Sequence, residues 1–346
     1  MSANIISVKC AELQPGMQIA EMLATRFNTK LVTKGTILDE SLIVKIRDAG
    51  IEKVSVYDLS QAQVEDNRER FVEEYKENLN EVKSFFSELD SSSIFKIDKI
   101  RGIVSTTLES SIANRDVIHS LNSVRGLDDY TYVHSMNVGI LSSLIAKWSR
   151  WSEDDIKKIT YAGLLHDIGK IRVPQHILNK PGKLTPEEFE QIKQHPIYAF
   201  DMLKKADNLS SDIKQAVLTH HEREDGSGYP LGLTGDKIHP YAKVLAIADV
   251  FDAMVSDRCY HAKDSPFAVF EFFVDQCLNK LDPGLLNTFV INMAPYYTGE
   301  KVLLSNGQEA EVIFVDPRNV SRPLVKVREE IINLAQNRTL TIQPLK

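Results

Sequence analysis

Several kinds of sequence feature are absent from this chain of 346 residues. It has no run of more than two consecutive basic residues and a net charge of −7, which argues against a cationic surface that binds nucleic-acid polymers. The three cysteines, Cys10, Cys259 and Cys277, form no CxxC pair and no even-numbered framework, so a reducing compartment is expected. The N-terminus lacks a signal-peptide pattern, and no uncharged apolar run approaches the roughly 20 residues that span a bilayer. The sequence therefore predicts a cytoplasmic protein that is not inserted in a membrane.

The two ends of the chain show mixed helix and strand patterns. Residues 1–60 are predicted to form a small α+β domain, because helical spacing from Asp39 to Ala49 is followed by the β-branched stretch Val54-Ser-Val56. Residues 296–346 are predicted to form a short C-terminal β appendage, with Asn306-Gly307 as a hairpin turn. An apolar fraction of 43% is sufficient for packed cores in more than one domain.

The middle of the chain is predicted to be helical. Residues 61–100 contain neither glycine nor proline and repeat apolar residues at steps of three or four, which indicates a helical connector. That helix could be a stalk for a homodimer or a surface helix packed on its own chain, and the sequence does not decide between the two. Residues 101–295 are predicted to form one all-α domain, with helices starting after Ser152, Thr185 and Ser265.

Five of the nine histidines and two aspartates occupy positions suited to metal ligation. They are His134 at the start of a helix, His166-Asp167 after an apolar helix, His195 at the end of the helix begun at Thr185, His220-His221 at the end of another helix, and Asp249 within an apolar helix. These nitrogen and oxygen donors, with no thiolate, suit Fe, Mn, Ni or Zn. Seven donors are too many for one ion but reasonable for two, and a carboxylate can bridge a pair of metals.

Each of these positions has an ordinary explanation when it is taken singly. His195 could be a histidine that is favourable near a helix C-terminus, His220-His221 could be a solvated pair, and Asp249 could be a core carboxylate with a hydrogen-bond partner. Together, their recurrence at the ends of successive helices favours a metal site. The four remaining histidines are expected at the surface: His119, His176, His239 and His261.

The loop after the double histidine is a second candidate for ligand binding. Its glycines and prolines, including Gly228 and Pro230, allow a ligand to approach the backbone closely. Tyr229 offers an aromatic face on which a base could stack, and a turn with a core tyrosine explains the motif equally well. Lys170, one helical turn after His166, is the predicted cation beside a phosphate.

Together these motifs resemble the HD-GYP family, the bacterial branch of the HD phosphohydrolases that hydrolyses cyclic di-GMP. The resemblance covers roughly residues 101–295. It rests on the order and spacing of His134, His166-Asp167-x-x-Lys170, His195, His220-His221-Glu222, Gly228-Tyr229-Pro230 and Asp249. Residues 5–58 resemble a small N-terminal domain that is often joined to this family. The expected fold class is therefore multidomain α+β, with a central all-α HD-type domain.

The resemblance implies an activity and a role for each matching residue. A metal-activated hydroxide would hydrolyse the phosphodiester bond of cyclic di-GMP to pGpG and further to GMP. The implied ligands of two divalent ions, Fe or Mn with Ni or Zn as substitutes, are His134, His166, Asp167, His195, His220, His221 and Asp249. Asp167 would bridge the metals and Lys170 would contact the phosphate. The implied substrate contacts are Gly228, Tyr229, Pro230, Arg258 and His261.

Some positions depart from the family pattern, so more than one function is compatible with the sequence. Family members that hold three metals have a glutamate where this chain has Tyr130, so two metals are expected. Cys259 stands where the family usually has proline, and His261 where a basic residue often follows. These departures leave room for a mixed cyclic GMP–AMP substrate, and the alternative is that His261 simply substitutes as a hydrogen-bond donor. Two further hypotheses are a nucleotide receptor with weak turnover and a phosphohydrolase for dNTPs or (p)ppGpp. The intact ligand set favours an enzyme over a receptor, and Gly228-Tyr229-Pro230 is not explained by the phosphohydrolase.

Overall fold

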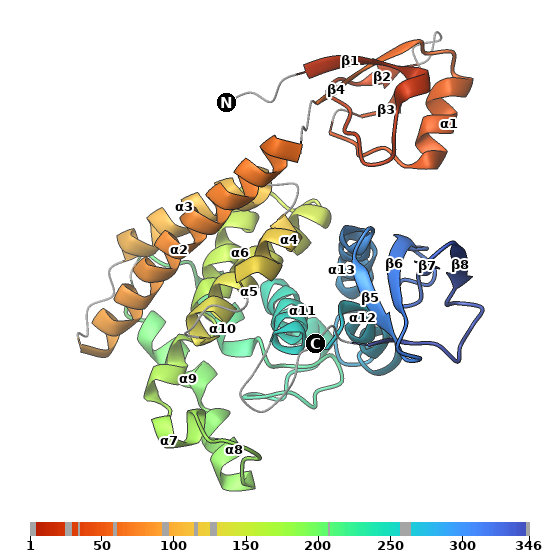
Figure 1. Ribbon diagram of the computed structural model, residues 1–346. Coiled ribbons are helices and arrows are strands. Elements are labelled where there is room, and N and C mark those ends of the chain that lie inside the picture. Colours follow the sequence, from red (N-terminus) through yellow and green to blue (C-terminus); the bar gives the residue numbers. More distant parts are fainter. Residues whose placement is uncertain are drawn as a thin grey trace. The chain divides into compact units, whose positions relative to one another are not determined.

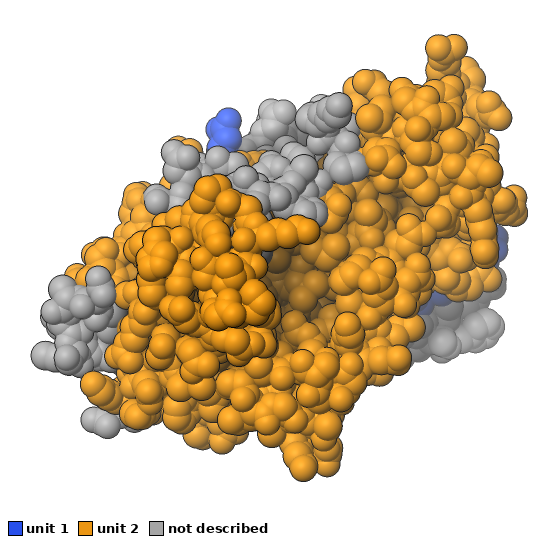
Figure 2. Space-filling model, turned by 90° about the horizontal axis from the view of Figure 1, so that it is seen from below, with its two compact units in different colours: residues 1–69 blue, residues 70–346 orange. Residues whose placement is uncertain are grey.

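The structure is a computed structural model that describes residues 5–24, 30–33, 35–57, 61–91, 97–113, 117–124, 130–206, 208–256 and 264–343. The chain divides into two compact units, residues 1–69 and residues 70–346, which Figure 2 shows in different colours. Helix α2 (Gln61–Ser91) begins in the first unit and continues into the second. The segment predicted as a connector therefore belongs partly to each unit.

The first unit combines a helix with short antiparallel strands (Figure 1). Strand β1 (Ile5–Lys9) pairs with β4 (Lys53–Tyr57), and β2 (Leu23–Ala24) pairs with β3 (Lys30–Val32). Helix α1 (Glu40–Asp48) starts at Asp39, whose side chain accepts a hydrogen bond of 2.7 Å from the backbone N–H of Leu42. The core of this unit includes Ile19, Leu38, Ile43, Ile46, Val54 and Val56. Helix and strands thus occur together here, as the sequence predicts.

The apolar stripe of α2 is buried in the core of the second unit. Its members are Phe71, Tyr75, Leu79, Val82, Phe85 and Phe86, each at most 4% exposed. A helix buries an apolar stripe because removing that surface from water is favourable. This stripe packs on its own chain, which is one of the two arrangements compatible with the sequence. A homodimer through α2 stays a prediction that would need another face of the helix.

The rest of the second unit is mainly helical. Its other α-helices are α3 (Ile97–Ala113), α4 (Val117–Val124), α5 (Tyr130–Trp148), α6 (Glu153–Leu165), α7 (Gln175–Leu178), α8 (Pro186–Ile192), α9 (His195–Leu203), α10 (Ser211–Thr219), α11 (Pro240–Val255), α12 (Pro266–Gln276) and α13 (Pro283–Met293). Short 3-10 helices are η1 (Cys10–Glu12) in the first unit and η2 (Ile168–Arg172), η3 (Gly235–Lys237) and η4 (Ala294–Tyr297) in the second. Among the described helices, none combines the length and apolar character that a membrane span needs.

Glycines allow the central helices to approach one another closely. A Cβ atom on Gly163 of α6 would lie 2.5 Å from the Cα atom of Gly139 on α5, a distance at which the two helices would have to separate. Close packing of α5 on α6 brings the start of α5 towards the end of α6. Those two positions hold His134 and His166.

Helix starts follow the sequence-based predictions. The hydroxyls of Ser152 and Ser265 accept hydrogen bonds from backbone N–H groups of α6 and α12, and Thr185 forms a complete capping box with Glu188 at the start of α8. One expectation is wrong: His195 does not end the helix begun at Thr185, because α8 stops at Ile192 and His195 is the first residue of α9. Pro196 explains the break, since proline has no N–H to donate and fits best in the first turn of a helix.

A five-stranded antiparallel sheet ends the chain, in the order β8-β7-β6-β5-β9 (Figure 1, blue). Its strands are β5 (Lys301–Leu304), β6 (Glu309–Phe314), β7 (Leu324–Val327), β8 (Glu330–Asn333) and β9 (Ile342–Gln343). Asn306-Gly307 joins β5 to β6 as predicted, and Gly307 has a positive φ of 81° that favours glycine. Alternate side chains such as Val302 and Val312 belong to the main core of the second unit. The sequence predicted β5 to β7 but not β8 and β9.

Candidate metal centre

The seven predicted ligands come from successive helices and lie together inside the second unit. His134 is the fifth residue of α5, His166 and Asp167 follow α6, and His195 opens α9. His220 and His221 follow α10, and Asp249 belongs to α11. All are buried except His221, whose side chain is 16% exposed. Most of these polar side chains come from helix ends, and Asp249 comes from within α11.

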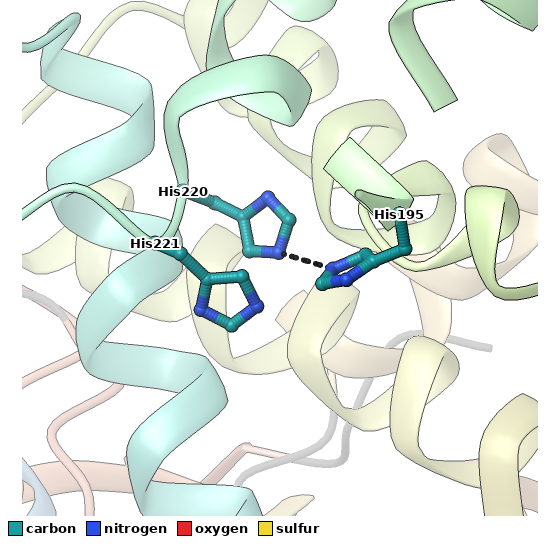
Figure 3. A group of neighbouring side chains, drawn as sticks. All are labelled: His195, His220 and His221. Carbon is teal, nitrogen blue, oxygen red and sulfur yellow. Dashed lines mark hydrogen bonds between the residues drawn. The ribbon is translucent and has the colours of Figure 1, made fainter. Parts of the chain in front are cut away.

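The ligand atoms form two groups. His134, His166 and Asp167 make the first group, and His195, His220 and His221 make the second. Within each group, one ligand atom from every residue lies within 4.8 Å of the others. Figure 3 shows the imidazole rings of the second group converging from α9 and from the end of α10. Each group has the size of a metal coordination sphere before the ligands close around an ion.

Two carboxylates connect the groups. Oδ2 of Asp167 lies 3.3 Å from Nε2 of His166, while its Oδ1 lies 3.3 Å from Nε2 of His195. Asp249 repeats the pattern, with Oδ1 at 3.0 Å from Nε2 of His134 and Oδ2 at 3.8 Å from Nδ1 of His221. Each carboxylate therefore directs one oxygen to each group. This is the arrangement that a pair of adjacent cations requires of its bridging ligands.

Local hydrogen bonds fix which nitrogen of three histidines faces the centre. Nδ1 of His166, His195 and His220 donates to the carbonyl oxygen three residues earlier, at 2.7, 2.8 and 2.7 Å. A carbonyl can only accept, so Nδ1 of each ring carries a proton and Nε2 faces into the site. Nε2 of His195 and Nε2 of His220 are 3.4 Å apart (Figure 3). Burial, together with neighbouring His166 and His195, holds the pKa of His220 well below its usual range, so a proton shared between these nitrogens is unfavourable.

The site contains buried polar atoms that lack a hydrogen-bond partner. Nε2 of His166 and Oδ1 of Asp167 have none among the described residues. Leaving such an atom unsatisfied costs about 1–3 kcal/mol. A divalent cation would satisfy both atoms and would separate the facing nitrogens of His195 and His220. The residues therefore fit a metal centre built from nitrogen and oxygen donors.

His134 is held by a side chain rather than by its own helix. Its Nδ1 lies 2.8 Å from Oδ2 of Asp252, a buried carboxylate that also accepts a hydrogen bond of 3.0 Å from Nδ2 of Asn137. Burial alone would lower the pKa of His134, but hydrogen bonds to Asp249 and Asp252 raise it to about 9. The role of Asp252 beside His134 was not predicted from the sequence. A second carboxylate three residues after Asp249, on the same face of an apolar helix, could have revealed it.

Lys170 places a cation beside the bridging carboxylate. Its Nζ lies 2.5 Å from Oδ2 of Asp167, and its side chain is 23% exposed, so the amine borders both the centre and solvent. Burial would raise the pKa of Asp167, but the charges of His166 and Lys170 hold it well below the usual range. Asp167 is therefore ionised and able to act as a ligand, and Lys170 is placed to attract an anion.

The Gly228-Tyr229-Pro230 loop packs against the second group. The ring of Tyr229 stacks on that of His221, with 4.6 Å between centroids and 28° between planes, and the Tyr229-Pro230 peptide bond is cis. The loop is held by Glu222, whose buried carboxylate accepts hydrogen bonds from the N–H groups of Leu231 and Leu233 at 2.7 and 2.9 Å. A Cβ atom on Gly228 would lie 2.4 Å from the Cα atom of Glu222, so only glycine fits there.

The segment that contains the seven predicted ligands matches a known protein family. A family model described as "HD domain" matches residues 112–285, half of the chain. This chain belongs to the HD domain family. The match confirms the resemblance that the motifs suggested, and the helical architecture of the second unit agrees with it.

Relatives with known names match part of this chain. A Pseudomonas aeruginosa protein named a cyclic di-GMP phosphodiesterase is 35% identical over 218 residues, covering 63% of this chain and 52% of the relative. A cyclic di-GMP phosphodiesterase of Thermotoga maritima is 44% identical over 146 residues, covering 42% and 39%. A Vibrio cholerae protein named 3'3'-cGAMP-specific phosphodiesterase 3 is 38% identical over 145 residues, covering 41% and 31%. The chain thus spans about half or less of the length of these relatives.

One solved structure shares the fold over most of the chain. It is described as an HDG"Y"P protein from Bdellovibrio bacteriovorus, and it superposes with a TM-score of 0.54 at 14% identity. The match covers 83% of this chain and 98% of that one. At this identity the likeness concerns the fold alone.

Other residues singled out by the sequence lie in varied surroundings. Arg258 and His261 lie outside the described residues, so their predicted contacts stay predictions. His176 is exposed as expected. His119 and His239 are half-buried instead: His119 pairs with Glu300 at 2.7 Å, and His239 caps α11. Tyr130 stacks its ring on His134, with 5.5 Å between centroids.

We expect the substitution Glu222→Gln to loosen the loop of this HD domain and leave the metal ligands in place. A glutamine can accept only one of the two backbone hydrogen bonds, and hydrogen bonds to a charged group contribute about 1.5–3 kcal/mol each. In the reaction proposed below, the KM for the cyclic dinucleotide should rise at least about tenfold, with unchanged metal content by elemental analysis. The control Glu309→Gln alters an exposed carboxylate of β6 and should change neither quantity. An unaltered KM in Glu222→Gln would show that the loop does not contribute to substrate binding.

Proposed function

We propose that this HD domain hydrolyses the phosphodiester bond of a cyclic dinucleotide, with cyclic di-GMP as the main substrate and pGpG, then GMP, as products. The observation that supports it best is the pair of three-residue donor groups connected by Asp167 and Asp249. Two adjacent cations are a common device for in-line displacement at phosphorus. The relatives from Pseudomonas aeruginosa and Thermotoga maritima, both named cyclic di-GMP phosphodiesterases, suggest the substrate.

The proposal assigns two divalent metal ions to the centre. His134, His166 and Asp167 would hold one, and His195, His220 and His221 the other, with Asp167 and Asp249 shared between them. Fe or Mn is the expected metal, and Ni or Zn would also suit these donors. When bound, such ions supply Lewis-acid stabilisation of a phosphoryl group and lower the pKa of water. Tyr130, at the position of the third-metal glutamate of some relatives, is consistent with two ions rather than three.

Residues beside the metal ligands would bind and orient the substrate. Lys170 would neutralise charge on the scissile phosphate from its position next to Asp167. The face of Tyr229 would stack on a base, and the bare backbone at Gly228, fixed by Pro230, would let the nucleotide approach closely. Arg258 and His261 would add contacts to phosphate or guanine. In this proposal residues 101–295 are the catalytic domain, with residues 1–60, the connector 61–100 and residues 296–346 appended.

A mixed cyclic GMP–AMP is the second candidate substrate. The observation that favours it is the similarity to the Vibrio cholerae protein named 3'3'-cGAMP-specific phosphodiesterase 3. Cys259 and His261, which depart from the usual family pattern, lie in the segment expected to contact the base. The complete set of ligands favours turnover of either nucleotide over a receptor that only binds it.

Metal removal tests the proposal directly. Protein reconstituted with Mn²⁺ or, under anaerobic conditions, Fe²⁺ should contain about two ions per chain and should hydrolyse cyclic di-GMP and 3'3'-cGAMP at different rates. Exhaustive chelation should abolish turnover, and added metal should restore it. Chromatography of the products identifies pGpG and GMP. Full turnover by metal-free protein, or no turnover of either nucleotide by metal-loaded protein, would contradict the proposal.

A further inference from the structure

A row of buried side chains connects helix α2 to the metal centre. The Tyr75 hydroxyl on α2 donates to Oδ1 of Asn137 on α5 at 2.9 Å. Nδ2 of Asn137 donates to Oδ1 of Asp252 on α11 at 3.0 Å, and Oδ2 of Asp252 accepts from Nδ1 of His134 at 2.8 Å. Tyr75 and His134 are each 2% exposed, and Asn137 and Asp252 are fully buried. Buried polar groups with satisfied partners are rigid because breaking any one bond leaves an unpaired group in the core.

Each member of the row has its donor and acceptor atoms assigned by its neighbours. Asn137 accepts with its oxygen from Tyr75 and donates with its nitrogen to Asp252, which fixes the orientation of the amide. Asp252 offers one oxygen to Asn137 and the other to His134. Asp252 can only accept, so Nδ1 of His134 carries a proton, and Nε2 faces Asp249 and Asp167 at 3.0 and 3.7 Å. The orientation of this ligand thus depends on the whole row.

His134 differs in this respect from three other ligands. His166, His195 and His220 are each oriented by a backbone carbonyl three residues earlier. His134 is oriented by a carboxylate on α11, which an amide on α5 and a phenol on α2 hold in turn. The Tyr75 hydroxyl also lies 3.1 Å from the carbonyl oxygen of Val133, the residue before His134. The contacts of Tyr75 therefore converge on His134 through both a side chain and the backbone.

We infer that Tyr75 and Asn137 are positioning residues of the metal centre. They act through Asp252 on the tautomer and ring orientation of His134, and so on the affinity of the first donor group for its ion. Groups that hydrogen-bond a ligating histidine typically change metal affinity about 10–100-fold when they are removed. This inference rests on the proposed function in so far as it requires the group of His134, His166 and Asp167 to bind a metal.

Binding of Mn²⁺ to the full chain tests the inference. Tyr75→Phe removes one oxygen atom from a side chain that touches no ligand. It should raise the Kd of Mn²⁺ at the first donor group several-fold. Asn137→Ala removes a group that is one hydrogen bond closer to His134, so its Kd should rise more, by roughly 10–100-fold. Tyr241→Phe is the matched control, because it also removes a tyrosine hydroxyl that bonds a carboxylate, that of Asp155, on the same unit. Its Mn²⁺ affinity should equal that of the wild type even where its Tm falls as much as that of Tyr75→Phe.

A double variant separates a connected row from two independent effects. If Tyr75 acts mainly through Asn137, the Kd of Tyr75→Phe combined with Asn137→Ala should lie close to that of Asn137→Ala alone. The inference would be overturned if the effects of the two substitutions on the Kd multiply, or if Tyr75→Phe leaves the Kd unchanged. In that case, normal Mn²⁺ binding and hydrolysis by wild-type protein would leave the proposed function standing. Wild-type protein that binds no Mn²⁺ would overturn both. Should Asn137→Ala fail to fold, the comparison of Tyr75→Phe with Tyr241→Phe decides alone.

Discussion

Replacing Asp167 with alanine is expected to abolish hydrolysis of cyclic dinucleotides and to remove bound metal from both donor groups. Asp167 is the residue with one oxygen at 3.3 Å from His166 and the other at 3.3 Å from His195. Loss of a shared ligand should cost several kcal/mol of transition-state stabilisation, which corresponds to at least about 10³-fold in kcat. Steady-state kinetics and elemental analysis of the purified variant measure the two effects.

The chain offers a close control for Asp167→Ala. Asp201 forms an ion pair with Lys204 over the same sequence spacing and the same 2.5 Å as Asp167 with Lys170, but it lies on the surface. Asp201→Ala should retain wild-type turnover and metal content, because exposed ion pairs contribute only about 0–1 kcal/mol. Turnover that persists in Asp167→Ala after chelation would rule out the two-metal mechanism.

We expect Gly169→Ala to disrupt the centre, although the substitution replaces none of the proposed ligands. A Cβ atom at position 169 would lie 2.0 Å from the carbonyl oxygen of His195 and 2.6 Å from the backbone nitrogen of Ala199. Both contacts are backbone atoms of α9, so the helix would have to move away from η2 and take His195 with it. Overpacking of this kind costs about 1–3 kcal/mol or more, and a ligand displaced by about 1 Å can reduce turnover about 10²-fold. Thermal unfolding and metal titration measure these effects.

Gly102→Ala is the control for that glycine substitution. Gly102 lies on α3 with no atom within 4 Å of the site of its added Cβ, so alanine fits and should stabilise the helix by about 0.5–1 kcal/mol. A Tm at or above that of the wild type, with full activity, is expected. If Gly169→Ala behaves like Gly102→Ala, the close contact between η2 and α9 does not position His195.

Residue types and their spacing were sufficient to select the side chains that gather at the candidate centre and to predict most of the local structure. Ser152, Thr185 and Ser265 stand before their helices because a hydroxyl satisfies the free N–H groups of the first turn, a local interaction that sequence reveals. Asn306-Gly307 predicted its hairpin for the same reason. The histidines and aspartates could be selected because so many metal-type side chains at helix ends are improbable by chance.

Contacts between distant segments were beyond that kind of inference. Strand β8 was missed because Glu330-Ile-Ile-Asn333 does not alternate between apolar and polar residues, and β9 because two residues are too few to show a period. Asp252 and Asn137 were missed because their partners, His134 and Tyr75, lie 118 and 62 residues away. The stripe of α2 fitted a dimer stalk as well as a core, since periodicity shows which face is apolar and not what covers it.

By itself, the sequence determined which side chains are candidates for metal binding and where the helices after Ser152, Thr185 and Ser265 begin, because both depend on residue type and near neighbours. Tertiary structure alone decided that Asp167 and Asp249 each direct one oxygen to each histidine group, and that His134 is oriented from α2 through α5 and α11. The physical reason is that a metal centre requires atoms within a few ångströms of one another, and only the packing of helices distant in sequence sets those separations.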